Sequence, residues 1–301
     1  MCLTVVVLLG LACAPTIRPT APRAAPAPPD VAVIDLRSGA SLSMAELAEA
    51  LRLGDFVLLG EVHDNPVHHR LRAELLATTG KARAAAVFEH FDRAPVPLGR
   101  PGASTPLADW LDANGFDREG WRWPLHAPLV ERALANATAL RGSGLRGAAL
   151  REVVMKGPAA APAGLRELTS RAPLDAAASA RLDAELLAGH CGMLPAEALP
   201  GMRAAQQWRD AAMAEALLAS RVDGQPWLFA GNGHVRKDLA VPHLLQALVP
   251  GARLLSVGFI ERLEDGTMPP LPPLSEYDVV VVTPGVPNRG DPCEVFRKPR
   301  G

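Results

Sequence analysis

The chain has 301 residues, of which 49% are hydrophobic, and a formal net charge of −1. This length suffices for one large domain, or two small ones, with a substantial core. The balanced composition is typical of a globular protein and lacks the strongly basic character of polyanion-binding proteins, so nucleic acid is not an expected partner.

The first thirty residues differ in composition from the rest. Residues 1–13 contain the apolar run "CLTVVVLLGLAC", which has the length of a signal peptide and is too short to span a bilayer as a stable helix. The run ends at Ala12-Cys13, which resembles the lipidation signal of a bacterial lipoprotein. Residues 14–30 are rich in Pro and Ala and suit a semi-rigid tether. A buried or disordered N-terminal segment is the alternative interpretation.

From residue 31 onward, strand and helix patterns alternate along the chain. The patterns predict strands at residues 31–36, 55–60, 84–89, 138–145, 226–230, 253–259 and 278–283. They predict helices at 43–54, 65–78, 106–115, 120–137, 174–188, 199–221 and 241–248, with a linker or surface loop at 156–168. Ser43 is the expected cap of the first helix, and Asn65-Pro66 the expected start of the second.

This alternation implies an α/β fold with a mainly parallel central sheet and helices on both faces. We expect a single domain over residues 31–301, in which the helices of residues 96–221 form a cap over the sheet.

Two cysteines, Cys191 and Cys293, lie within this domain, whereas Cys2 and Cys13 belong to the leader. In an exported protein the two could pair, but nothing in the sequence brings them together. The prediction is therefore two unpaired cysteines.

Three of the predicted strands end in the same kind of residue. Glu61 and His63 follow the strand at 55–60, Glu89 ends the strand at 84–89, and His234 follows the strand at 226–230. Carboxyl ends of neighbouring parallel strands line one crevice, so these four side chains are expected to converge. They could hold a divalent or iron ion, or act without metal as general acid and base. Their neighbours His68 and His69 are interpreted as surface or packing residues.

The helix at 199–221 carries two polar residues on its apolar stripe, Gln206 and Asp210. Such an inward-facing pair could brace a ligating histidine. A buried salt bridge to an arginine such as Arg93 is the alternative.

The segments "LLGEVHDN", "FEHFDR", "GWRW", "GHCGMLP", "MRAAQQWRDAAMA" and "AGNGHVRKDLAVPHLL" occur in this order over roughly residues 53–260. In these segments the chain resembles the ChaN-type haem-binding uptake proteins of the Tiki/TraB/erythromycin-esterase superfamily. The resemblance implies an α/β fold and a bacterial cell-envelope lipoprotein that serves haem or iron uptake. We expect it to be lipid-anchored to the periplasmic face of the outer membrane. In other members of the superfamily, residues that match Glu61, His63, Glu89 and His234 serve metal-dependent proteolysis or ester hydrolysis.

The haem ligand does not carry over from the resemblance. ChaN-type members are thought to ligate iron through a tyrosine, with haem held between two subunits, which implies a homodimer. The single tyrosine here, Tyr277, lies outside the matched segments, and His126 stands where the family often has a tyrosine.

Three functions remain open from the sequence. The first is a haem- or iron-binding lipoprotein, with Trp123 as an apolar wall and His126 or Tyr277 as candidate haem ligands. The second is a metal-dependent hydrolase that uses Glu61 or Glu89 as general base and His63 and His234 as metal ligands or proton shuttles. The third is a structural or interaction module whose polar cluster has no ligand. Arg93, Gln206 and Asp210 complete the candidate site as bracing residues.

Overall fold

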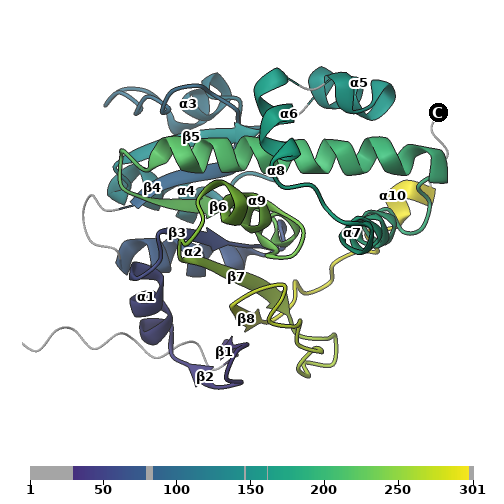
Figure 1. Cartoon of the computed structure of the whole chain (residues 1–301). Helices are drawn as coiled ribbons and strands as arrows, with labels where there is room; N and C mark the ends of the chain where they lie inside the picture. The colour runs from purple at the N-terminus through teal and green to yellow at the C-terminus, as the bar shows by residue number, and fades with distance from the viewer. Residues whose placement is uncertain (1–29, 79–83, 146, 161, 298–301) are drawn as a thin grey trace, which may run out of the picture.

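The computed structural model describes residues 30–78, 84–145, 147–160 and 162–297. Within these residues, an 8-stranded sheet has the order β2-β1-β8-β7-β3-β6-β4-β5 (Figure 1). The strands are β1 Ala32–Asp35, β2 Ser41–Leu42, β3 Phe56–Leu59, β4 Ala84–Asp92, β5 Ala139–Gly144, β6 Gln225–Phe229, β7 Leu254–Glu261 and β8 Val279–Thr283. The predicted leader, residues 1–13, and residues 14–29 of the tether lie outside the described residues.

Helices connect and cover these strands. They are α1 Met44–Arg52, α2 Pro66–Thr78, α3 Leu107–Ala113, α4 Ala127–Asn136, α5 Gly147–Lys156, α6 Ala163–Ser170, α7 Ala176–Gly189, α8 Leu199–Ser220, α9 Val241–Leu248 and α10 Glu294–Arg297, with short 3-10 helices η1 Pro158–Ala160, η2 Ala196–Ala198 and η3 Asn232–Val235. None of the described helices is both long and apolar enough to cross a membrane.

The strands from β8 to β5 in this order run parallel, and β1 and β2 join antiparallel at the edge beside β8. The predicted α/β class with a mainly parallel sheet is therefore confirmed. Every residue of β3 is buried, as expected for a central strand that is covered on both faces.

Each sheet face has its own apolar core because side chains alternate along a strand. Val57 and Leu59 pack into one core together with α1, α2, α3 and α4. Phe56 and Leu58 pack into the other core together with α6, α8 and α9. In Figure 1, α8 is the long helix that crosses the view, and it contacts α5, α6, α7 and α9. The stretch predicted as a cap, 96–221, contains α5, α6, α7 and α8 but not α9, and it also contributes β5 to the sheet.

Local capping signals explain where the first two helices begin. The Ser43 side chain accepts from the Glu46 N–H at 3.2 Å while Glu46 accepts from the Ser43 N–H at 2.7 Å, which is a complete capping box. At the start of α2, the Asn65 side chain accepts from the Val67 N–H at 2.9 Å. Both predicted helix starts are confirmed.

Two predicted elements differ from the structure. The helix predicted at 120–137 begins only at Ala127, because Pro124 disfavours a helical conformation at Trp123 and the preceding residues form turns. The loop predicted at 156–168 contains the start of α6, where Leu165 is fully buried in the core beneath α8. Burial of this leucine outweighs the loop-forming composition around it.

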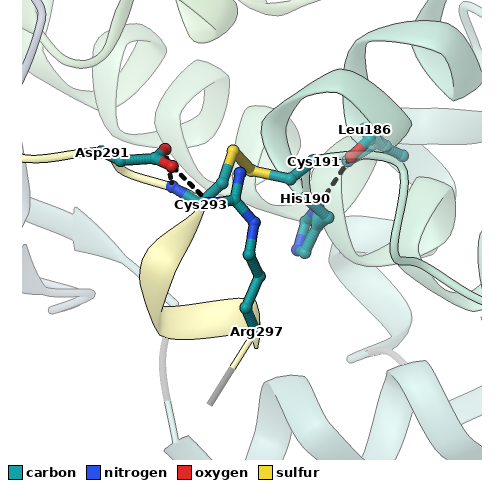
Figure 2. The surroundings of a disulfide bond; sticks show 6 residues. All are labelled: Leu186, His190, Cys191, Asp291, Cys293 and Arg297. Atoms are coloured by element: carbon teal, nitrogen blue, oxygen red, sulfur yellow. Dashed lines mark hydrogen bonds and ion pairs between the residues drawn. A yellow bond between two sulfur atoms is a disulfide. The ribbon is translucent and has the colours of Figure 1, made fainter.

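The prediction of two unpaired cysteines is wrong. Cys191 and Cys293 form a disulfide across 102 residues of sequence, with their Cα atoms 5.7 Å apart (Figure 2). It joins the segment after α7 to the residue before α10, where the Asp291 side chain accepts from the Cys293 N–H at 2.8 Å. In the chain-entropy model, closing a loop of this length stabilises the folded state by about 4.7 kcal/mol. Sequence spacing could not predict the pair because the two residues meet only through the tertiary fold.

Candidate functional site

The carboxyl ends of three adjacent strands bring the predicted residues together. β6 lies between β3 and β4 and pairs in parallel with both. Glu61 and His63 follow β3, Glu89 lies within β4, and His234 lies in η3 directly after β6. All four residues therefore lie at the carboxyl edge of the sheet, but they do not form the single cluster that the sequence predicted.

The sheet divides these residues between its two faces. Along β4, Phe88 packs into the core beneath α2 and α4, whereas Val87 packs into the core beneath α8. Strand alternation therefore directs His90 to the α2 face and Glu89 to the α8 face. We call the two groups the Glu61 cluster, which consists of Glu61, His63, His69, Arg72, His90 and His126, and the Glu89 cluster, which consists of Glu89, Gln206, Arg209, Asp210 and His234.

In the Glu61 cluster, a buried carboxylate is surrounded by imidazoles. Glu61 Oε1 lies 2.6 Å from His63 Nδ1, 2.8 Å from His90 Nε2 and 3.5 Å from His126 Nε2. Its other oxygen forms an ion pair with Arg72 of α2. Burial lowers the pKa of Arg72 to about 9, so the guanidinium stays charged at neutral pH and compensates the carboxylate.

His69 supports this ion pair from the same helix. Its Nε2 donates to the His63 carbonyl at 2.9 Å, so its Nδ1 is left to accept from Arg72 at 2.9 Å. Burial lowers the pKa of His69 to about 4, which keeps the ring neutral, as this hydrogen-bond pattern requires. His68 holds the loop before α2 by accepting from the Val62 N–H at 2.9 Å. Both histidines are therefore buried and hydrogen-bonded, and neither is a surface residue.

His90 and His126 complete the cluster inside the protein. Their ring centroids are 4.4 Å apart, and that of Trp121 is 4.7 Å from His90. Burial holds the pKa of both histidines far below the usual value, so both rings are neutral. Neither nitrogen of His126 makes a hydrogen bond with any residue that the structure describes.

In the Glu89 cluster, the carboxylate is held in place by groups from three elements. Glu89 Oε2 accepts from the Gly231 N–H at 2.8 Å, and Oε1 pairs with Arg209 and lies 3.4 Å from His234 Nε2. Burial acts to raise the pKa of Glu89, but His234 and Arg209 outweigh it and hold this pKa well below the usual range.

Asp210 braces His234 from the other side. Its Oδ1 lies 2.6 Å from His234 Nδ1, and Gln206 Nε2 lies 3.3 Å from the same nitrogen. Burial acts to lower the pKa of His234, but the Glu89 and Asp210 carboxylates outweigh it and raise this pKa. The predicted bracing of a histidine by Gln206 and Asp210 is thus observed.

Arg93, the arginine suggested as the partner of Asp210, lies elsewhere. It pairs with Glu215 of α8 at 2.6 Å, at the surface. Asp210 pairs with His234 instead, and the arginine of this cluster is Arg209, whose side chain is 26% exposed and pairs with Glu89.

His63 connects the two clusters and the surface. Its side chain is 43% exposed, and its Nε2 would lie only 2.7 Å from a Cβ at position 231, so Gly231 makes room for the ring. A surface pocket of about 360 Å³ opens beside it, lined by Val62, His63, Asp64, Gly120, Trp121 and Arg122.

Two predicted haem residues lie away from this pocket. Tyr277 is buried against Gly258, and its hydroxyl lies 3.4 Å from the Asn232 carbonyl. Trp123 packs on Phe116, with ring centroids 5.6 Å apart, so the neighbouring Trp121 is the tryptophan that contacts the histidines.

Sequence reasoning missed four contributors: His69, Arg72, His90 and Arg209. Period-two alternation could have identified His90, since it shares a strand face with Phe88. The three-residue spacing of His69 and Arg72 on one helix also indicates a shared face. No pattern in the sequence distinguishes Arg209 from other arginines.

Together, the fold and the two clusters define an α/β protein with buried Glu/His chemistry at the carboxyl edge of its sheet. A family model described as "Haem-binding uptake, Tiki superfamily, ChaN" matches residues 47–245. The chain belongs to this family.

One solved structure is similar to this chain at the level of the fold. The structure described as "Cofacial heme binding to ChaN of Campylobacter jejuni" is similar with a TM-score of 0.63 and 16% identity, covering 85% of this chain and 97% of that one. An erythromycin esterase mutant in its open conformation has a TM-score of 0.39 and 14% identity, covering 80% of this chain and 78% of that one. A Bacillus cereus protein has a TM-score of 0.38 and 14% identity, covering 81% and 92%. No curated protein matches the chain.

Replacing Arg209 with Met tests the ion pair that Arg209 forms with the buried Glu89 carboxylate. The variant leaves the Glu89 carboxylate buried without its guanidinium, and we expect the free energy of unfolding to fall by about 3 kcal/mol in urea denaturation at neutral pH. The matched control is Arg93→Met, which breaks the surface ion pair with Glu215 just after β4. This variant should lower the free energy of unfolding by at most about 1 kcal/mol. Equal losses in both variants would contradict the assigned role of Arg209.

The buried neutral histidines predict acid sensitivity. Burial lowers the pKa of His68 to about 3 and that of His69 to about 4, so between pH 6 and 5 the unfolded chain binds protons at these sites and the folded chain does not. The free energy of unfolding should therefore decrease as the pH is lowered from 6 to 5, by up to about 1.4 kcal/mol per pH unit for each histidine. In denaturant titrations of the metal-free protein, His68→Gln should reduce this slope by about that amount.

His234 supplies the control for this pH dependence. Its pKa is raised, so its contribution to stability is complete below the unfolded value and is lost only as the pH rises through the folded value. His234→Gln should thus leave the slope between pH 6 and 5 unchanged. An unchanged slope in His68→Gln would show that His68 is protonated in the folded protein.

Proposed function

We propose that this protein binds haem at the surface pocket beside His63, in the service of haem or iron uptake. The observation that carries the proposal is His63 itself, the exposed histidine of the Glu61 cluster. Its Nδ1 donates to Glu61 at 2.6 Å, which fixes the orientation of the ring and leaves Nε2 as the free nitrogen. Nε2 makes no hydrogen bond to the described residues, so it is the nitrogen that would ligate iron.

The residues around His63 fit a haem group. Trp121, whose ring centroid lies 5.0 Å from that of His63, offers an apolar wall for the porphyrin. Arg122 has a side chain that is 70% exposed and offers a cation for a propionate. Iron in haem supplies the redox and ligand-binding chemistry, and the protein supplies binding and orientation.

Two features of known proteins support this proposal. The description of the family to which the chain belongs names haem-binding uptake. The description of the Campylobacter jejuni ChaN structure names cofacial haem binding. A haem ligated by His63 on one face would leave its other face open. We infer that a second haem, held by a second copy of the chain, covers it, which makes a homodimer the expected haem-loaded state.

The earlier ligand candidates fit less well. His126 and Tyr277 are 1% and 6% exposed, so neither reaches a haem at the surface in this conformation. Trp123 lies in a separate depression with Phe116 and Asp117.

A hydrolase is not favoured by the site. A general base needs a carboxylate oxygen that can reach a water or substrate proton. Glu61 and Glu89 are 2% and 1% exposed, so neither carboxylate reaches a substrate in the surface pocket.

Haemin titration followed by absorbance tests the proposal. We expect a saturable Soret shift in the wild type, weakened at least about tenfold in His63→Ala, and a haemin-dependent doubling of mass in sedimentation. Tyr277→Phe and His126→Gln are the matched controls and should retain the Soret shift. A wild type without saturable binding would rule out haem binding, and a loss confined to His126→Gln would assign the ligand to His126 instead.

We further propose that the chain is exported and lipid-anchored through Cys13, at the periplasmic face of the outer membrane. The Ala12-Cys13 leader supports this, and so does the Cys191–Cys293 disulfide, because disulfides persist in oxidising compartments. Mass spectrometry of protein extracted from membranes under alkylating conditions should find a lipid-modified N-terminal Cys13 and an unalkylated Cys191–Cys293 pair. An unprocessed N-terminus with alkylated cysteines would contradict export.

A further inference from the structure

Three donor atoms inside the Glu61 cluster lie close enough to share one ion. Ligand atoms of Glu61, His90 and His126 all lie within 4.8 Å of one another, and all three residues are buried. Glu61 Oε1 lies 2.8 Å from His90 Nε2 and 3.5 Å from His126 Nε2. A tetrahedral ion with bonds of 2.0–2.1 Å to nitrogen separates its donors by about 3.3 Å, so these distances need little adjustment.

His126 gives an independent reason to expect an ion. The residue is 1% exposed, and neither of its ring nitrogens makes a hydrogen bond to any described residue. Burying unpaired polar atoms costs free energy, and buried side-chain nitrogens nearly always have a partner. The unpaired Nε2 faces Glu61 Oε1 but is too far away for a good hydrogen bond.

The surroundings of Glu61 leave this oxygen available. Arg72 engages Oε2, so the guanidinium stabilises the carboxylate without covering Oε1. His63 donates to Oε1 from the pocket side and can keep this hydrogen bond when Oε1 also binds an ion.

We propose that Glu61, His90 and His126 bind a divalent first-row transition metal ion such as Zn²⁺ or Fe²⁺ inside the protein, at a site that needs no bound haem. Two imidazoles and one carboxylate suit these ions better than Mg²⁺ or Ca²⁺. Three protein donors leave a coordination position open for water or a small ligand. This assignment differs from the metal ligands expected from the sequence, since Glu89 and His234 belong to the other face of the sheet.

The test uses the full protein without haemin. Elemental analysis of the protein as purified should find a stoichiometric transition metal ion. After chelation, the protein should take up Zn²⁺ or, under anaerobic conditions, Fe²⁺, and added Co²⁺ should give the visible absorption of a bound ion. His90→Ala and His126→Ala should each lose this uptake, whereas His243→Ala on α9, at the opposite sheet face, should retain it.

Two outcomes would overturn the site. A wild type that is purified without metal and takes up none of the three ions refutes it, whether or not the variants fold. Uptake equal to the wild type in both His90→Ala and His126→Ala also refutes it, with thermal melting used to establish that each variant is folded. His126→Gln replaces His126→Ala if the latter unfolds. Because haemin is absent throughout, these results are independent of the haem titration.

Discussion

The ion pair between Glu61 and Arg72 is the constraint on which the site depends. A carboxylate buried after a central strand is costly unless an opposite charge and hydrogen bonds compensate it. Arg72 supplies the charge from α2, and the start of α2 is fixed in turn by Asn65 and by His68. The β3–α2 connection is therefore shaped by the need to bury one charge, and His63 is presented at the surface as a consequence.

The sheet separates two kinds of polar chemistry at the same edge. On the α2 face, Glu61 contacts several neutral or hydrogen-bonded imidazoles and retains an oxygen that a ligand could use. On the α8 face, Glu89 is fully engaged by Arg209, Gly231 and His234. In the Glu89 cluster, the buried polar groups have hydrogen-bond or ion-pair partners within the cluster, as expected for residues that hold neighbouring elements in place. We therefore assign ligand binding to the first face and support of the β6–η3 turn to the second.

Much of the fold was predictable because its signals are local. The apolar run of β3, the Ser43 capping box and the Asn65-Pro66 start depend on neighbouring residues only. The placement of Glu61, Glu89 and His234 at one edge followed from the rule that parallel strands end at the same edge, but the rule does not say on which sheet face each side chain lies. The choice of Arg209 over Arg93 and the Cys191–Cys293 bond depend on how distant segments pack, so sequence spacing carries no signal for them.

The proposed haem ligand and the proposed ion would share one oxygen atom, Glu61 Oε1. An ion bound there would withdraw negative charge from the carboxylate that accepts from His63, and so would make His63 Nε2 a weaker ligand for haem iron. Haem ligated by His63 would in turn weaken ion binding, because it would make the Nδ1–H a stronger donor toward the same oxygen and leave that oxygen a poorer ligand for the ion. Binding linkage requires these effects to be reciprocal, so the interior of the Glu61 cluster can set the affinity of its surface for haem.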